Sequence, residues 1–450
     1  MENRFDTHFY LPRFRKIIEE IKKGSHVQLG DVVSFAKETS DFSEYPNGSF
    51  EYLEISGINL GINFYNTVTT EVKNAPSRAK LKTYVGDIVI STTRPHRGAV
   101  AEIVNDGIIA STGFSIIRNI SSQIDKTWLL HVLLSEVCLQ QMLQRSSGGN
   151  YPAIIEDEIK RICIPIVSQE KQVSMAATIN EALKIRNQKI IESNNLLASV
   201  SNIVLNKLGL IFDTSKAKTS YAVSLANIDG RIDADYYSPK FSFFRKQIED
   251  SRFDVLSVGE ISQNVVTGFA AGKQDQADDL PEEQRVPHLR PFSITTEGEL
   301  SFETKKYVPI SSLKESDYCK KNEVVFNNTN SPELVGKTTV FDSDVLCAAS
   351  NHMTRITVKD GVNPYYISAF FNVLLSIGYW KLLCTNFNNQ AGVNIETLKN
   401  VRIPLPPKEL QDEIAMEIMQ RRGKVNTLRK EAECDWKKAK KKFEEELLEG

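Results

Sequence analysis

The chain has 450 residues, which at roughly 100 to 200 residues per domain predicts two or three domains. Hydrophobic residues make up 41% and charged residues 25% of the sequence, an ordinary globular mixture that excludes disordered and fibrous classes. The formal net charge is −2, whereas a protein that binds nucleic acid unaided usually carries a basic excess. If this chain binds DNA, a partner must therefore supply much of the positive charge.

Neither a membrane segment nor a metal framework is indicated. No apolar run reaches the ~18 residues that span a bilayer, and the charged start MENRFDTHFY is not typical of a signal peptide. We therefore expect a soluble cytoplasmic protein with no membrane contact. The six cysteines lie far apart without CxxC spacing, which argues against a zinc site and predicts buried thiols; they are Cys138, Cys163, Cys319, Cys347, Cys384 and Cys434.

An internal repeat organises the chain. The segment RFDTHFYLPRF at Arg4–Phe14 matches RIDADYYSPKF at Arg231–Phe241. Four further matches keep the same order with a slowly growing offset: Leu29–Val32 with Val258–Ile261, Tyr52–Ile58 with His288–Ile294, Gly86–Val89 with Asn322–Val325, and Ile164–Gln172 with Ile403–Gln411. We conclude that the chain contains two tandem copies of one unit.

Each copy has the same predicted order of elements. Short β-branched and aromatic runs come first and predict strands, for example at 87–91 and 323–326. One amphipathic helix follows, near 128–143 in the first copy and at about 365–383 in the second. A long helix ends each copy: the first runs from Gln169 to Leu208 with Ser168 as N-cap, and the second starts after Pro406 and Pro407.

The two long helices carry apolar stripes that suit a coiled coil. The stripe residues are Ile179, Leu183, Ile190, Leu197, Val200, Val204 and Leu208 in the first helix, and Ile414, Ile418, Val425, Leu428, Ala432, Trp436, Ala439, Phe443 and Leu447 in the second. Because the first helix delivers the chain to the second globular part, the second helix can pack on it only by running back. We expect an antiparallel pair about 60 Å long, which matches a duplex contacted at two separated places.

Three motifs are similar to those of the specificity (S) subunit of type I restriction-modification systems. They are RIDADYYSP from Arg231, FNNTNSPELVGKT from Phe326 and NQAGVNIETLKNVRIPLPP from Asn389, and the resemblance covers essentially the whole chain. It implies an α+β fold with two pseudo-symmetric globular target-recognition domains separated by two long antiparallel helices. The implied boundaries are 1–165 for the first target-recognition domain, 166–208 for the central spacer helix, 209–404 for a linker and the second domain, and 405–450 for the C-terminal spacer helix.

The resemblance also implies a function without catalysis. Each domain would read one half of a bipartite site in double-stranded DNA. The helices would set the unread gap and dock two DNA adenine methyltransferase (modification) subunits and, in the nuclease form, restriction or motor subunits. These partners would wrap the DNA, which accounts for the missing basic excess, and no cofactor or metal is expected. Two alternatives stay open: the specificity subunit of a type IIB-like system, and a coiled-coil scaffold with no DNA role.

Catalytic motifs are missing from the sequence. Asn363-Pro-Tyr-Tyr366 resembles the Asn-Pro-Pro-Tyr tetrad of adenine methyltransferases, but the second Pro and a Gly-rich cofactor loop are absent. Pro364 is better interpreted as the first residue of a helix. There is also no P-loop, GxSxG or HExxH motif, so motor, hydrolase and zincin functions have no support.

Candidate DNA contacts in the first copy lie in a basic stretch in which Asp87 is the only acidic residue from 78 to 101. A charge cluster is usually a solvated face, but the resemblance favours DNA contact. Arg94 or Arg97 would suit guanine O6 and N7, while Thr92 and Thr93 would suit phosphate or a thymine methyl. The candidates are Arg78, Lys80, Thr92, Thr93, Arg94, His96 and Arg97, and Lys82 belongs to the same cluster.

In the second copy, candidates follow an apolar strand. Asn327, Asn328, Asn330 and Ser331 would suit adenine edges and phosphates, although Asn and Ser-Pro sequences also simply form turns. Lys337 is expected to contact a phosphate rather than a base. Gln390 precedes the second long helix, and the loop 148–151 is its equivalent in the first copy.

Overall fold

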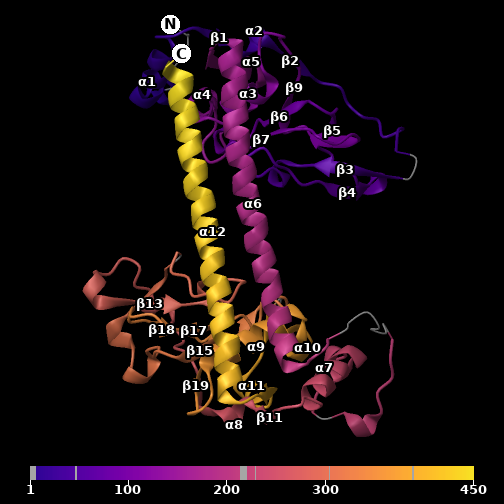
Figure 1. The fold of residues 1–450 in the computed structure, drawn as a ribbon, viewed down its shortest axis with the longest axis vertical. Coiled ribbons are helices and arrows are strands. Elements are labelled where there is room, and N and C mark those ends of the chain that lie inside the picture. Colours follow the sequence, from indigo (N-terminus) through magenta and orange to yellow (C-terminus); the bar gives the residue numbers. More distant parts are fainter. Residues whose placement is uncertain are drawn as a thin grey trace. The chain divides into compact units, whose positions relative to one another are not determined.

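The computed structural model describes residues 7–45, 48–212, 220–228, 230–303, 305–387 and 390–449. The chain forms two compact units: unit 1 contains residues 1–189 and 430–450, and unit 2 contains residues 190–429. The long helices α6 (Gln169–Leu208) and α12 (Lys408–Glu449) each contribute to both units (Figure 1). Residues 4–6 of the first repeat match and Asn389 of the third motif lie outside the described residues.

Unit 1 is built around two four-stranded sheets, with strand orders β2-β9-β6-β7 and β4-β3-β8-β5, and a ribbon of β1 with β10. Its elements are α1 (Pro12–Ile21), β1 (His26–Gln28), α2 (Leu29–Val32), β2 (Val33–Ala36), β3 (Ser49–Leu53), β4 (Val68–Glu71), β5 (Ala79–Lys82), β6 (Ile88–Ser91), β7 (Val100–Glu102), β8 (Ile108–Ser111), β9 (Phe114–Ile120), α3 (Lys126–Leu133), α4 (Glu136–Arg145), α5 (Glu156–Lys160) and β10 (Cys163–Pro165). Strand β6 is buried on both faces: Ile88 and Ile90 join the core under the helices, while Val89 joins the core between the sheets.

Unit 2 repeats this plan, with the sheets β12-β19-β15-β17 and β14-β13-β18 and the ribbon β11-β22, and adds a small sheet, β16-β21-β20. Its elements are α7 (Pro239–Glu249), β11 (Asp254–Ser257), α8 (Val258–Ile261), β12 (Ser262–Thr267), β13 (Arg285–Leu289), β14 (Tyr307–Pro309), β15 (Glu323–Asn327), β16 (Thr329–Asn330), β17 (Thr338–Phe341), β18 (Ala348–Ala349), β19 (Met353–Val358), α9 (Pro364–Ser376), α10 (Tyr379–Leu383), β20 (Thr385–Phe387), β21 (Gln390–Gly392), α11 (Ile395–Lys399) and β22 (Arg402–Leu405). Strand β15 corresponds to β6, with Val324 and Phe326 on one face and Val325 on the other.

The predicted repeat is confirmed in its main elements, although the second sheet has four strands in unit 1 and three in unit 2. Matched segments form the same short helices, α2 and α8, and the central strands β6 and β15 have the same neighbours. A left-handed residue precedes each central strand, Gly86 with φ 93° and Asn322 with φ 68°. Glycine and asparagine are the residues that most readily adopt this conformation, so both copies have kept the same turn.

The single amphipathic helix predicted in each copy is wrong, because each is two helices. In unit 1, α3 ends at Leu133 and Ser135 takes an extended conformation before α4 begins. In unit 2, Gly378 with φ 79° separates α9 from α10. Both segments are apolar enough to look continuous in sequence, but the backbone turns between their halves.

The helix start at Pro364 is confirmed. Asn363 is the N-cap of α9, and its side chain accepts hydrogen bonds from the backbone N–H groups of Tyr365 and Tyr366 at 2.8 and 3.3 Å. Its amide also donates to Asp412 Oδ1 at 2.6 Å. The polar atoms that a methyltransferase tetrad would offer to a target amine are engaged in holding the helix.

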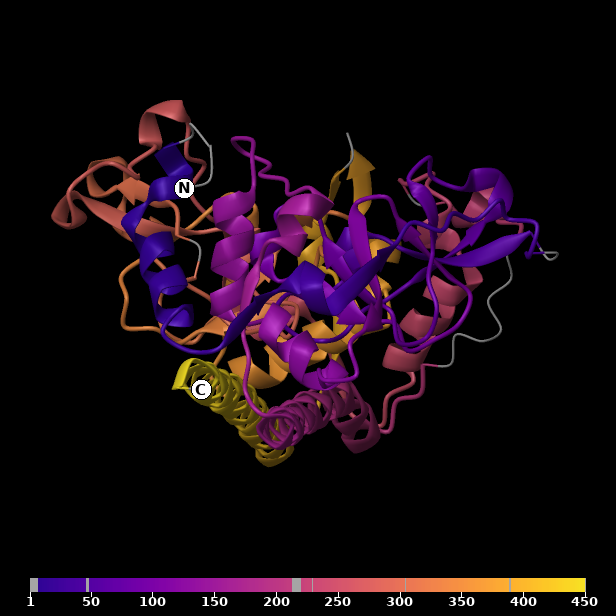
Figure 2. The ribbon, with the colours of Figure 1, turned by 90° about the horizontal axis from the view of Figure 1, so that it is seen from above.

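Both long helices have the predicted extents, and Ser168 Oγ accepts the Lys171 N–H at 3.4 Å as predicted for an N-cap. They pack antiparallel within each unit. In unit 1, Arg186 pairs with Glu433 and Lys189 with Glu431; in unit 2, Lys207 pairs with Glu413. Figure 2 looks nearly along α6 and α12 and shows the strands of unit 1, in indigo and purple, gathered on one side of them.

The apolar stripes of the long helices join the unit cores. Ile179, Trp436 and Phe443 belong to the core of unit 1, and Val204 and Ile414 belong to that of unit 2. Each globular part is therefore fixed to both helices by buried apolar side chains. Burial of apolar surface stabilises the folded state by about 25 cal/mol for each Å² removed from water.

Four of the six thiols are buried as predicted, but the prediction is wrong for Cys163, which is partly exposed, and for Cys434, which is exposed on α12. Within the described ranges, no helix combines the length and the apolar character needed to cross a membrane.

Candidate nucleic-acid interface

In unit 1 the basic segment lies against the loop that follows α4. Thr93 and Ser147 both form antiparallel bridges with Ala153, and the backbone N–H of Arg94 donates to Pro152 O at 2.7 Å. Residues far apart in sequence thus form one surface.

Arg94 is held on this surface by an aromatic ring and a backbone carbonyl. Its backbone is left-handed, with φ 48°, and its guanidinium lies 4.0 Å from the ring centroid of Tyr151. Nη2 donates to Asn150 O at 2.9 Å, whereas Nε and Nη1 make no hydrogen bond within the described part of the chain. Tyr151 is 69% exposed. The planar guanidinium therefore keeps two nitrogen atoms, Nε and Nη1, for hydrogen bonds and lies beside an exposed aromatic ring. This arrangement suits the recognition of guanine.

The neighbours of Arg94 differ in what they offer. Arg97 is exposed. His96 has a buried Nδ1 without a hydrogen-bond partner among the described residues. Burial, followed by the charges of Arg97 and Arg94, lowers the pKa of His96, which favours the neutral ring. Thr92 and Thr93 are half-buried, and the Thr92 hydroxyl donates to Gly113 O at 2.9 Å.

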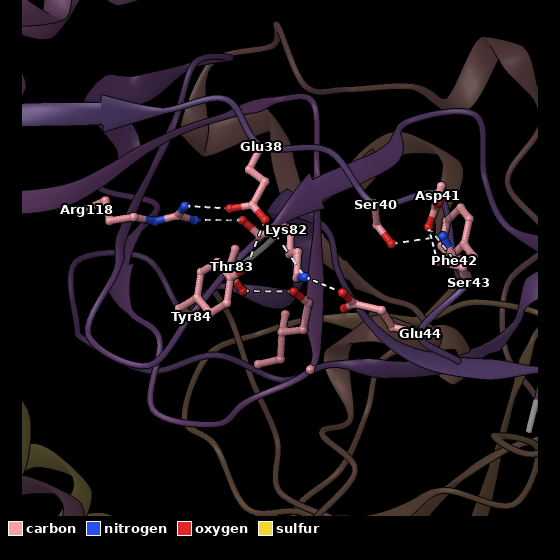
Figure 3. Close-up of polar contacts among 12 residues, drawn as sticks. Glu38, Ser40, Asp41, Phe42, Ser43, Glu44, Lys82, Thr83, Tyr84 and Arg118 are labelled. Carbon is pink, nitrogen blue, oxygen red and sulfur yellow. Dashed lines mark hydrogen bonds and ion pairs between the residues drawn. The ribbon is translucent and has the colours of Figure 1, made fainter. Parts of the chain in front are cut away.

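The basic cluster is smaller in the fold than in the sequence. Lys82 pairs with Glu44 at 2.7 Å, and the hydrogen bond to Glu44 is the main reason that its pKa is raised. Glu38 accepts from Arg118 and from the Tyr84 hydroxyl, both at 2.8 Å, beside the same lysine (Figure 3). Arg78 and Lys80 are exposed and form no ion pair within the described ranges. These two residues, not Lys82, remain available to an anion.

In unit 2 the loop after β15 is largely held inside the protein. Asn327 is fully buried: its amide donates to Thr329 O and His352 O at 2.9 and 3.1 Å, and its Oδ1 accepts from Asn330 at 2.7 Å. Asn328 is 7% exposed and donates to Thr354 Oγ1 at 2.9 Å. Asn327 therefore stabilises the turn after β15, as the alternative interpretation of the sequence proposed. Its predicted contact with a base has no support in this geometry.

Lys337 also points inward. It is 6% exposed, and its ammonium donates to Pro291 O at 2.7 Å and Ile294 O at 2.5 Å. Burial lowers its pKa. A phosphate cannot reach an ammonium enclosed in this way, so the predicted phosphate contact does not fit the structure.

Two residues of the loop after β15, Asn328 and Thr329, line a cleft of about 680 Å³. The lining combines amide and hydroxyl side chains with one aromatic ring, two aliphatic side chains, a glycine and one carboxylate: Thr267, Asn328, Thr329, Asn351, Thr354, Thr385, Phe387, Gly392, Val393, Asn394, Ile395 and Glu396. Asn330, the last residue of β16, and the following Ser331 are half-buried, and Gln390 is exposed at the start of β21. Thr329 pairs with Gly392, which brings the loop and the β20–β21 hairpin together.

The two units join loop and hairpin in the same way. The Thr93–Ala153 and Ser147–Ala153 bridges of unit 1 correspond to the pairing of Thr329 and Thr385 with Gly392 in unit 2. Each hairpin region carries an exposed aromatic residue, Tyr151 or Phe387, the latter 47% exposed. Phe387, Asn351 and Thr385 were not predicted from the sequence. The position of Phe387 between two asparagines, just before a strand, could have marked it in the sequence as an exposed aromatic residue.

A duplicated α+β unit whose paired loop and hairpin present cations, amides and an exposed aromatic ring has the features of a protein with two DNA-recognition surfaces. The chain belongs to the type I restriction modification DNA specificity domain family, whose model matches residues 22–195 and 264–433. The family expected from the sequence is thereby confirmed, and a coiled-coil scaffold without a DNA role is not favoured.

Two relatives illustrate the match. A type I restriction enzyme MjaX specificity subunit from Methanocaldococcus jannaschii is 26% identical over 161 residues, which is 34% of this chain and 38% of that protein. A solved chain of a type I restriction-modification system, from work on its complex assembly and conformational transition, has 18% identity and a TM-score of 0.52. It covers 94% of this chain and 96% of its own length, and it shows that the fold is shared.

Proposed function

We propose that this chain is the DNA-reading subunit of a type I restriction-modification complex, and that each unit reads one half of a bipartite site. The observation that carries the proposal is the double match to the DNA specificity domain, once in each half of the chain. The two surfaces differ chemically, since unit 1 offers Arg94 beside Tyr151 and unit 2 offers a cleft whose lining includes three asparagines. Different half-sites require such a difference.

In unit 1, Arg94 and Arg97 are the proposed base readers, with guanine as the preferred target because a guanidinium matches O6 and N7. Arg78 and Lys80 are proposed phosphate contacts, because phosphate contacts position a protein on the duplex without reading sequence. Thr92, Thr93 and His96 are proposed supporting contacts that act as neutral hydrogen-bonding groups.

In unit 2, Asn330, Ser331 and Gln390 are the proposed contacts, supported by Asn328 at the cleft wall. Amide side chains pair well with the N6 and N7 edge of adenine, so this half-site is expected to be rich in adenine contacts. Asn327 and Lys337 are not retained as contacts, because both are buried and neither lines the cleft.

We infer that the chain is not catalytic and that its partners perform the chemistry. The proposed partners are double-stranded DNA, two adenine methyltransferase subunits that flip the target base, and restriction subunits in the nuclease form. A net charge of −2 supports this division, because partners would supply the charge that holds DNA. A type IIB-like machine built on the same subunit is the second candidate. The boundaries at 165/166, 208/209 and 404/405 are kept as proposed limits of the recognition domains and spacer helices.

The half-site assignment is tested by a matched pair of variants. Arg94→Ala in unit 1 and Asn330→Ala in unit 2 are each assembled with the methyltransferase partner, and the methylated motif is determined by sequencing. Each lost base contact is expected to cost roughly 1 to 3 kcal/mol and to relax preference in one half-site only. Equal loss of preference in both half-sites, from either variant, would refute the assignment of one reader to each unit.

A further inference from the structure

The N-terminal arm of each repeat makes a contact that the proposed DNA readout does not explain. This arm is the segment that matches most clearly between the copies, and in unit 2 it runs from Arg231 to Phe241. Its first residue, Arg231, lies against the end of α10. The chain passes from α10 directly into the β20–β21 hairpin, which borders the cleft of unit 2.

Arg231 binds the last carbonyls of this helix. Its Nη1 donates to Leu383 O at 2.8 Å and its Nη2 to Cys384 O at 3.2 Å. The final carbonyls of an α-helix have no partner within the helix, so a forked cation is well suited to bind two of them.

The guanidinium is itself held in place. Its Nε donates to Asp233 Oδ2 at 2.8 Å, and its carbon lies 4.3 Å from the ring centroid of Tyr236. Arg231 therefore has an ion pair, an aromatic contact and two carbonyl bonds in one fixed orientation. None of these donors is directed at a ligand.

The segment that Arg231 holds is the root of the hairpin, by which we mean residues 383–385, where α10 ends and β20 begins. Thr385, the first residue of β20, follows Cys384 immediately and pairs with Gly392. Gly392 in turn pairs with Thr329 of the loop that carries the proposed readers. A short hairpin is marginally stable by itself, so its position depends on how its ends are anchored.

Unit 1 makes the corresponding connection by a different bond. Gln144, in the last turn of α4, donates from Nε2 to the backbone oxygen of Phe9 at 2.9 Å. Phe9 belongs to the arm of the first copy, and α4 leads into the loop that carries Tyr151. In both units a hydrogen bond thus connects the N-terminal arm to the end of the helix before the hairpin region. The arm supplies the donor in unit 2, whereas the helix supplies it in unit 1.

We propose that Arg231 is a positioning residue: it fixes the root of the β20–β21 hairpin and thereby sets how sharply unit 2 discriminates its half-site. The effect on discrimination rests on the proposed function, whereas the anchoring of the hairpin does not. The test therefore measures the two separately.

The experiment compares Arg231→Ala with Arg245→Ala in the full chain. Arg245 is the matched control, because its guanidinium lies 5.1 Å from the Tyr236 ring and 4.9 Å from the Phe241 ring but makes no hydrogen bond to α10 within the described residues. Amide hydrogen exchange is followed at Thr385–Phe387 and Gln390–Gly392. We expect R231A to accelerate it at least about tenfold, with β15 amides unchanged, and R245A to leave it near the wild-type rate.

The methylated motif of the assembled complex is the second readout. R231A is expected to relax base preference in the half-site read by unit 2 and to leave the other half unchanged, an outcome that simple loss of folded protein cannot produce. Unchanged hairpin exchange in R231A, equal acceleration in R245A, or fast exchange with an intact motif would each overturn the proposal.

A wild-type complex that methylates without sequence preference would instead refute the proposed function and leave the exchange result standing as support for the anchoring. If β15 exchange shows that R231A unfolds unit 2, Arg231→Gln replaces it. This variant keeps one amide donor, so intermediate acceleration is expected and wild-type exchange would overturn the proposal.

Discussion

Removing one heptad from each long helix tests whether α6 and α12 set the gap between the half-sites. Two ion pairs show which residues of the helices lie opposite one another. Arg186 of α6 pairs with Glu433 of α12, and Lys207 of α6 pairs with Glu413 of α12. Residues 190–196 therefore lie opposite 424–430. Deleting both blocks removes Glu192 together with its partner Lys424 and keeps the pairs of Lys189 and Lys207.

The size of the effect follows from helix geometry. Seven residues at about 1.5 Å each shorten the spacer by ~10 Å, and seven residues fall only about 20° short of two full turns. At ~3.4 Å per base pair, the unread gap should shrink by about three base pairs. Activity should fall as well, because three base pairs are nearly a third of a duplex turn and the half-sites rotate accordingly.

Methylome sequencing of cells that carry the double deletion and the methyltransferase partner measures both half-sites and the gap. Both half-site sequences should survive with a shorter gap. An active complex with an unchanged gap would refute the spacer role, and altered half-site bases would show that part of a reading surface was deleted. Deleting the heptad from α6 alone is the control, since it breaks the register and should abolish activity.

Three further predictions concern single side chains. In a double-mutant cycle, Arg94→Ala and Tyr151→Ala should be coupled by about 0.5 to 1 kcal/mol in binding a duplex that contains the methylated site, and additive losses would show that their stacking does not contribute. Lys337→Met should destabilise unit 2 by about 1 to 3 kcal/mol in urea, because two buried carbonyls lose their donor, while the salt dependence of DNA binding stays that of the wild type; a shallower salt dependence would restore Lys337 as a phosphate contact. Burial lowers the pKa of His288 to about 4, so the unfolded state binds the extra proton between about pH 4 and 6.5. The stability of unit 2 should therefore fall by up to about 3 kcal/mol as the pH drops through that window. His288→Phe should reduce this pH dependence. If the free energy of unfolding in urea falls equally with pH in the wild type and the variant, the prediction is wrong.

The repeat and the long helices could be predicted because their signals are local. Matched turns such as those at Gly86 and Asn322, and apolar steps of three and four along α6, depend only on neighbouring residues. The break at Ser135 escaped prediction because the apolar pattern continues across it. A change of backbone direction leaves little trace in side-chain periodicity.

The candidate site was predicted as segments rather than as side chains. Lys82 was grouped with the basic cluster because Glu38 and Glu44, which pair with it, come from a separate part of the chain. Asn327 and Lys337 have the composition of DNA contacts, yet both point inward to satisfy backbone carbonyls. Whether a polar side chain faces solvent depends on tertiary packing, which no spacing of residues reports.

The proposed function requires that one chain reads two separate half-sites for a methyltransferase partner. Methylome sequencing of the source strain, with and without this gene, measures this. We expect a bipartite motif with adenine methylation and a fixed unread gap, present with the gene and lost without it. A continuous motif, or methylation that persists unchanged without the gene, would show that the chain does not read two half-sites.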